Sequence, residues 1–124
     1  MRIFLDTSVL SETNLSRLAD SVLDRYVRGD QFFINSVVHF QIEWGYHSAG
    51  KSPQKYKDFL NGFRVEVLPV TKMDAEEAAK MKPGHSSLLD ALIASSVKRY
   101  DGILWTADKD FLRFLPKSHV RILL

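Results

Sequence analysis

The chain has 124 residues, of which 45% are hydrophobic and 26% charged, and this composition is typical of one globular domain. It contains no cysteine, which excludes disulfides and thiolate metal sites. Its 17 Lys and Arg against 15 Asp and Glu give a net charge of +2, which neither requires nor excludes a nucleic-acid partner. No apolar run reaches the roughly 20 residues of a membrane span and no signal-peptide core is visible, so a cytoplasmic protein is expected.

In the first half of the chain, short apolar runs alternate with stretches of helical periodicity. In chain order they predict a strand at 3–5, a helix over 15–26, a strand at 32–34 and a helix over 37–47. Gly29 is placed to end the first of these helices. Ser52 and Pro53 predict the N-cap and first residue of a further helix that extends to Phe63.

The second half continues the same alternation. It predicts a strand at 65–70, a helix capped by Thr71 and Asp74, a helix over 89–100, a strand at 103–106, a short helix over 108–115 and a strand at 120–124. There are no internal repeats or linkers. The sequence therefore predicts a single α/β domain over residues 1–124, with a parallel or mostly parallel sheet and helices on both faces.

Four acidic residues fall where the carboxyl ends of parallel strands would meet. Asp6 directly follows the first predicted strand, and Asp108 lies two residues past the fourth. Asp90 is in the first turn of the helix before the fourth strand, and Glu43 lies about two turns into the helix after the second. Ligands of open α/β sheets bind beyond these strand ends, so the four acids are candidates for a functional site.

Each acid also has a purely structural interpretation. Asp6 and Asp108 are suitable caps, Asp90 complements a helix dipole, and Glu43 fits a solvated helix face. Several carboxylates in one place, however, repel each other unless some are protonated or a cation neutralises them. With oxygen ligands and no cysteine, the favoured cation is Mg²⁺ or Mn²⁺, which indicates phosphoryl or phosphodiester chemistry.

The sequence resembles the PIN-domain family, and most of all the VapC-type ribonuclease toxins of bacterial toxin–antitoxin pairs. The likeness covers the whole chain and is carried by FLDTS with Asp6, SVVHFQIEWG with Glu43, LLDALIA with Asp90 and LWTADKDF with Asp108. The resemblance implies a five-stranded parallel sheet in the order 3-2-1-4-5, flanked by helices. It also implies a Mg²⁺- or Mn²⁺-dependent endoribonuclease that cleaves single-stranded regions of RNA with a metal-activated water.

The family motifs also imply roles for particular residues. The catalytic acids would be Asp6, Glu43, Asp90 and Asp108. Of these, the first and the last two would hold the metal, while Glu43 would help bind it or orient and deprotonate the attacking water. Thr106, together with Thr7 or Ser8, would support the acids through hydrogen bonds. Asp110 matches a position that more often shapes the following helix.

The resemblance further implies two protein partners, a second copy of the chain and a cognate antitoxin. One departure concerns them: the segment from Val70 to Asp90 is shorter than is common in the family, and Lys82, Pro83 and Gly84 interrupt its helix. The apolar faces of the helices over 15–26 and 56–63 are expected to form either a partner groove or part of the core.

Two other functions remain open. An aspartyl phosphatase would use Asp6 as nucleophile, although the haloacid-dehalogenase type requires a second Asp at position 8, where this chain has Ser8. A non-catalytic PIN-like module would bind RNA or a partner without cutting. The complete set of acids argues against the second alternative.

The remaining chemistry-bearing residues have weaker signals. The four histidines lack metal-ligand spacing and are expected on the surface or in supporting positions. Trp44 and Trp105 lie in apolar runs and are expected in the core. Tyr46 is expected in the core or an interface, with base stacking as the alternative. A solvated helix face, or phosphate contacts, would account for Lys51, Lys55 and Lys57.

Overall fold

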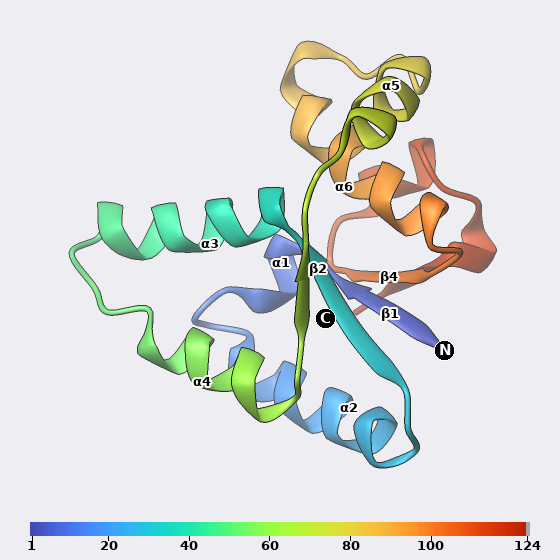
Figure 1. The fold of residues 1–124 in the computed structure, drawn as a ribbon. Coiled ribbons are helices and arrows are strands. Elements are labelled where there is room, and N and C mark those ends of the chain that lie inside the picture. The colour runs from blue at the N-terminus through green and yellow to red at the C-terminus, as the bar shows by residue number, and fades with distance from the viewer. Residues whose placement is uncertain (124) are drawn as a thin grey trace.

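A five-stranded parallel sheet forms the centre of the molecule, which is described by a computed structural model over residues 1–123 (Figure 1). Its strand order is β3-β2-β1-β4-β5, and every neighbouring pair is parallel. The strands are β1 (Arg2–Leu5), β2 (Gln31–Asn35), β3 (Glu66–Leu68), β4 (Ile103–Thr106) and β5 (Val120–Ile122). The predicted fold class and strand order are confirmed.

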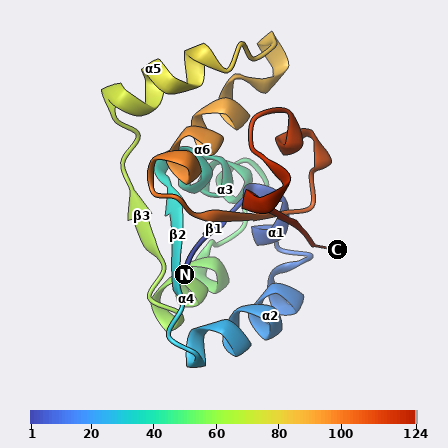
Figure 2. The same cartoon turned by 90° about the vertical axis from the view of Figure 1, so that its right-hand side faces the viewer.

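Helices connect all the strands. They are α1 (Thr7–Leu10), α2 (Leu15–Val27), α3 (Ser36–Ser48), α4 (Gln54–Gly62), α5 (Lys72–Lys80) and α6 (Leu88–Arg99), with 3₁₀ turns at His85–Ser87, Lys109–Arg113 and Lys117–His119. Figures 1 and 2 show α5 and α6 on one side of the sheet and α2 and α4 on the other. Among residues 1–123, no helix is long and apolar enough to cross a membrane.

Local signals in the sequence explain several element ends. Thr71 and Asp74 form the predicted capping box of α5, each side chain bonding the other residue's backbone N–H. Gly29 has φ +91°, a left-handed conformation that ends α2 and that other residues adopt only with strain. Asn35 caps α3 by accepting from the Val38 N–H, and its amide donates to Ser96 Oγ, which fixes α3 against α6.

Some elements differ from their predicted extents because the backbone bonds elsewhere. The strand predicted at 65–70 covers only Glu66–Leu68: the Val65 N–H bonds Leu60 O at the end of α4, and the Val70 N–H bonds Ser36 Oγ. Helix α4 begins at Gln54, with Pro53 as its N-cap in place of Ser52. The short helix predicted over 108–115 is a 3₁₀ turn, and residue 124 of the last predicted strand lies outside the described residues.

The core confirms one of the two tryptophan predictions. Trp105 on β4 is fully buried, as expected. Trp44 is 63% exposed, so its prediction as a core residue is wrong. Helix α3 buries the face that contains Val38, Ile42 and Tyr46, and Trp44 lies two residues from Ile42, about 200° around the helix.

Candidate active site

The carboxyl end of β1 delivers Asp6 into an enclosed position at the edge of the sheet. Asp6 is only 4% exposed, and its backbone N–H bonds Trp105 O, so it is fixed to the neighbouring strand β4. Its carboxylate also caps α1, accepting from the Ser8 N–H at 3.4 Å. Asp6 therefore has the capping role that its structural interpretation predicts. The other groups around its carboxylate determine whether it can also bind a cation.

Two hydroxyls hold the Asp6 carboxylate, one from helix α1 and one from strand β4. Ser8 Oγ and Thr106 Oγ1 each donate to Asp6 Oδ2 at 2.8 Å. Ser8 Oγ in turn accepts from the Ala107 N–H at 2.9 Å, so the loop after β4 is tied to the loop after β1. Among residues 1–123, every hydrogen bond that reaches this carboxylate goes to Oδ2, which leaves Oδ1 available to a cation.

Asp108 is positioned by the same hydroxyl network. Its backbone N–H donates to Thr106 Oγ1 at 3.0 Å, and its Oδ1 accepts from the Asp110 N–H at 2.9 Å, which starts the following 3₁₀ turn. Asp110 itself is exposed. Asp108 is therefore the N-cap of this turn, and Asp110 supplies the backbone N–H that the cap bonds. Asp108 is also the less exposed of the two residues.

The pKa of Asp90 depends in part on the charges of the neighbouring acids. It lies in the first turn of α6 and is partly buried. Burial, followed by the negative charges of Asp6, Asp108 and Asp110, raises the pKa of Asp90 from its ordinary value to about 6. The structure thus brings Asp6, Asp90 and Asp108 together at one edge, with Asp110 at its periphery.

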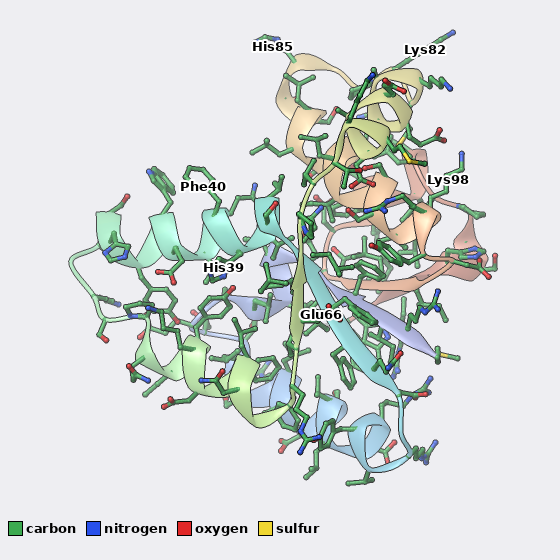
Figure 3. The ribbon with its side chains drawn as sticks, viewed as in Figure 1. His39, Phe40, Glu66, Lys82, His85 and Lys98 are labelled. Carbon is green, nitrogen blue, oxygen red and sulfur yellow. The ribbon has the colours of Figure 1, made fainter. Side chains whose placement is uncertain are left out.

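Glu43 is not brought to this edge. Its carboxylate pairs with His39 Nε2 at 3.8 Å and His47 Nε2 at 3.4 Å along α3, and with Lys57 Nζ of α4 at 3.7 Å. His39 also bonds the hydroxyl of buried Tyr56 on α4 at 2.7 Å. Figure 3 shows His39 on the α4 side of α3. Glu43 thus belongs to a contact between α3 and α4, away from Asp6.

The residue of α3 that reaches the turn after Asp6 is Gln41. The Thr7 hydroxyl donates to Gln41 Oε1, whereas Ser8 serves Asp6, so the two hydroxyls after Asp6 have separate partners. Gln41 and Glu43 are two residues apart and therefore about 200° apart around the helix. Sequence reasoning missed Gln41, because the apolar residues of α3 occur all around the helix and do not indicate which of its sides faces Asp6.

The donor set suits a hard divalent cation. Asp6 Oδ1 and the carboxylates of Asp90 and Asp108 would offer oxygen ligands, and a bound cation would relieve the repulsion that, after burial, raises the Asp90 pKa. In the part of the chain that the structure describes, no three His, Asp or Glu side chains are arranged to hold an ion by themselves. Mg²⁺ commonly uses only one or two carboxylates and keeps several waters, so an open set of this kind fits it.

Comparisons with known proteins agree with this geometry. A family model described as PIN domain matches residues 3–114. The fold is similar to that of a chain in the crystal structure of VapBC2 from Rickettsia felis bound to a DNA fragment from their promoter, with a TM-score of 0.72, 19% identity and 100% of both chains covered. It is also similar to VapBC-1 from nontypeable Haemophilus influenzae, with a TM-score of 0.71, 15% identity and 98% of both chains covered.

A third solved structure has no assigned function. It is a domain of a functionally unknown protein from Methanocaldococcus jannaschii, with a TM-score of 0.65, 16% identity, and 99% of this chain and 91% of that one covered. Among curated proteins, no sequence matches this chain. At these identities the solved structures establish the fold, and the chemistry has to be argued from the acids themselves.

Proposed function

Because this chain belongs to the PIN domain family, we propose that it is a divalent-metal-dependent endoribonuclease that hydrolyses single-stranded regions of RNA, and that it is the toxin of a toxin–antitoxin pair. The observation that carries the proposal is the hydroxyl of Thr106, which donates to Asp6 Oδ2 and accepts from the Asp108 N–H and so holds two acids at one edge of the sheet. Asp90 lies close enough for the charges of both acids to contribute, after burial, to its raised pKa. Acids gathered in this way bind a cation, and a hard cation among carboxylates suits phosphodiester chemistry.

In this proposal Asp6, Asp90 and Asp108 hold Mg²⁺ or Mn²⁺, directly or through water. When bound, the ion lowers the pKa of a coordinated water and offsets charge that develops on the phosphate. Ser8 and Thr106 keep the Asp6 carboxylate in one orientation, which leaves Oδ1 toward the ion. The backbone N–H of Asp110 bonds Asp108 Oδ1 and so helps to orient that carboxylate.

Gln41 takes the place that the sequence suggested for Glu43, since Gln41 is the α3 side chain next to the Thr7–Asp6 turn. An amide orients a water or a phosphate oxygen by hydrogen bonding but does not remove a proton at neutral pH. The proton of the attacking water must therefore pass to one of the three carboxylates or to solvent. The Glu43 cluster with His39, His47 and Lys57 holds α4 against α3.

Two surfaces are proposed for protein partners, on the ground that the similar solved structures are VapBC proteins. Most apolar residues of α2 and α4 are in the core, so core packing accounts for them. Between the two helices, however, lies a groove of about 440 Å³, and this is where we place the antitoxin. Its apolar lining is Leu15, Ala19, Phe59 and Phe63, and its polar lining is Glu12, Ser16, Lys55 and Asp58. A second copy of the chain is placed on the two exposed aromatic residues of α3, Phe40 and Trp44.

The proposal is tested by replacing Asp6 with Asn, which preserves size but removes one charge. Mg²⁺-dependent cleavage of a single-stranded RNA is expected to fall at least a hundredfold, with an unchanged circular dichroism spectrum. Asp20→Asn, at an exposed position of α2, is the matched control and is expected to cleave like the wild type. Equal cleavage by Asp6→Asn and Asp20→Asn would contradict the proposal, as would acid-stable phosphate on Asp6, which would favour the phosphatase alternative.

A further inference from the structure

A cavity of about 270 Å³ adjoins the candidate active site on the α1 side of α3. Its polar lining includes Thr7, Gln41, Tyr46, Glu12 and Lys51. Thr7, the residue after Asp6, lines one part of this cavity and donates a hydrogen bond to Gln41 Oε1. At the other end, Lys51 Nζ and Glu12 Oε2 form an ion pair at 3.2 Å. The cavity thus extends from the acidic edge toward the segments that follow α1 and α3.

The face of α3 that forms one wall combines apolar and polar groups. Gln41, Gly45 and Ala49 follow one another at intervals of four residues, with Ile42 and Tyr46 beside them. This face points toward α1, as the Thr7–Gln41 bond shows, whereas Glu43 points toward α4. The wall is therefore a continuous surface that begins at the residue next to Asp6.

Tyr46 has a hydroxyl that the folded chain does not use. The residue is only 8% exposed, and among residues 1–123 its hydroxyl is the buried side-chain group without a hydrogen-bond partner. Burial, with the charge of Glu12, raises the pKa of Tyr46, so the hydroxyl stays protonated and remains a donor. A phenylalanine would pack equally well without leaving a polar group unsatisfied, so packing alone does not explain a tyrosine here.

Gly45 is a second group that packing does not explain. It lies inside α3, where alanine would favour the helix, and a Cβ built at this position meets no atom within 4 Å. Neither a positive φ nor a close neighbour requires glycine at this position. What glycine does provide is a flat, open wall in the middle of the cavity.

We propose that this cavity binds one nucleobase of the RNA strand, next to the phosphate that is cut, and so determines which base is preferred there. The inference rests on the proposed function, since it names a substrate contact of the same site. A planar base would lie on the flat wall at Gly45. Its polar edge would take hydrogen bonds from the Gln41 amide, which has two donors, and from the Tyr46 hydroxyl after a small side-chain shift.

Three features favour a nucleobase over a protein side chain from a partner. The cavity is lined by Thr7, the residue directly after Asp6, so a strand whose phosphate lies at Asp6 has its adjoining base within reach. Its volume is slightly below the roughly 300–1,000 Å³ of pockets for drug-sized ligands, as suits one planar ring system. The groove between α2 and α4 offers a larger apolar surface to a protein partner.

The test fills the cavity at Gly45 and compares this with the same change elsewhere. Gly45→Leu adds a side chain into the open space. Gly62→Leu is the matched control, because Gly62 is also a helical glycine, in α4, whose added Cβ would meet nothing within 4 Å. Tyr46→Phe removes only the hydroxyl. Each variant is measured in two ways. The first is the base preference of cleavage in a random-sequence single-stranded RNA pool. The second is titration with the four nucleoside 5′-monophosphates, followed through the backbone NMR signals of Gln41 and Ala49.

The expected result is that one mononucleotide shifts these signals in the wild type and in Gly62→Leu, and at least tenfold more weakly in Gly45→Leu and Tyr46→Phe. The base preference at one position beside the cut should fall at least tenfold in the same two variants. If the wild type cuts no RNA but still binds a mononucleotide here, the proposed function fails and the base site stands. If no mononucleotide shifts the signals, or if Gly45→Leu binds mononucleotides and selects bases like Gly62→Leu, the inference is overturned.

Discussion

At the scale of single residues, the candidate site is a set of carboxylates whose orientation is fixed by hydroxyls. Asp6 sits at the end of a buried strand because Ser8 and Thr106 satisfy one of its oxygens, and because its backbone bonds β4. A buried carboxylate without such partners would destabilise the fold by several kcal/mol. Asp90 has no comparable donors among the described residues, and its environment instead favours the neutral form.

The raised pKa of Asp90 predicts how stability depends on pH without metal. The pKa of Asp90 rises from its ordinary value of 3.8 to about 6 in the folded chain. Between these two pH values the folded state therefore binds more protons than the unfolded state. The free energy of unfolding should therefore fall as pH rises from about 4 to 6, and stay lower above that range. Asp90→Asn should remove this dependence and stabilise the metal-free protein at pH 7 by about 1–2 kcal/mol, after discounting for solvent screening.

Urea unfolding at several pH values, with EDTA present, measures this effect, and Asp20→Asn serves as the control. Adding Mg²⁺ at pH 7 should stabilise the wild type, because an ion that binds only the folded state shifts unfolding by mass action, and should stabilise Asp90→Asn less. An Asp90→Asn protein with the same pH dependence as the wild type would contradict the assignment of Asp90 to this cluster.

At the scale of elements, the sequence correctly predicted the caps and element ends that neighbouring residues determine. The parallel sheet, the capping box of Thr71 and Asp74 and the end of α2 at Gly29 all follow from signals within a few residues or from the alternation of strands and helices, whereas the strand order was implied by the family resemblance. The rotation of α3 did not follow. Its apolar residues, among them Val37, Phe40 and Trp44, occur all around the helix, so no sequence pattern shows that Gln41 rather than Glu43 lies beside Asp6.

The junction between α6 and β4 gives a prediction at the same scale. Gly102 is buried, and a Cβ there would lie 2.7 Å from two ring carbons of Phe4 and 3.2 Å from Arg2 O. Phe4 cannot move aside easily, because its ring packs against Phe33 and Tyr100. Gly102→Ala should therefore lower the free energy of unfolding by about 1–3 kcal/mol.

Gly45→Ala is the matched control for that substitution. Its Cβ meets no atom within 4 Å, so the helix should gain about 0.5–1 kcal/mol from the better helix former. Denaturant unfolding of the two variants is expected to show opposite signs. A neutral Gly102→Ala would mean that β1 and the α6–β4 junction adjust more freely than the packing around Phe4 indicates.

At the scale of the whole molecule, α3 presents different chemistry on each side. One side contributes Gln41 and the cavity wall, and a second pairs Glu43 with α4. A third side carries Phe40 and Trp44, one turn apart and 62% and 63% exposed, and Figure 3 shows Phe40 pointing away from α4. Exposed aromatic residues of this kind are enriched in protein interfaces. We therefore place the second copy of the proposed homodimer here.

Replacing Phe40 and Trp44 together with Ser tests this placement. Because both side chains are exposed, the double variant should keep the wild-type circular dichroism spectrum. In analytical ultracentrifugation the wild type is expected at twice the 14.2 kDa of one chain and the double variant at 14.2 kDa. Val27→Ser, which removes a 72% exposed side chain from α2, controls for the loss of surface apolarity. A double variant that dimerises as tightly as Val27→Ser would show that the second copy binds elsewhere, and that these aromatic residues serve another partner of α3.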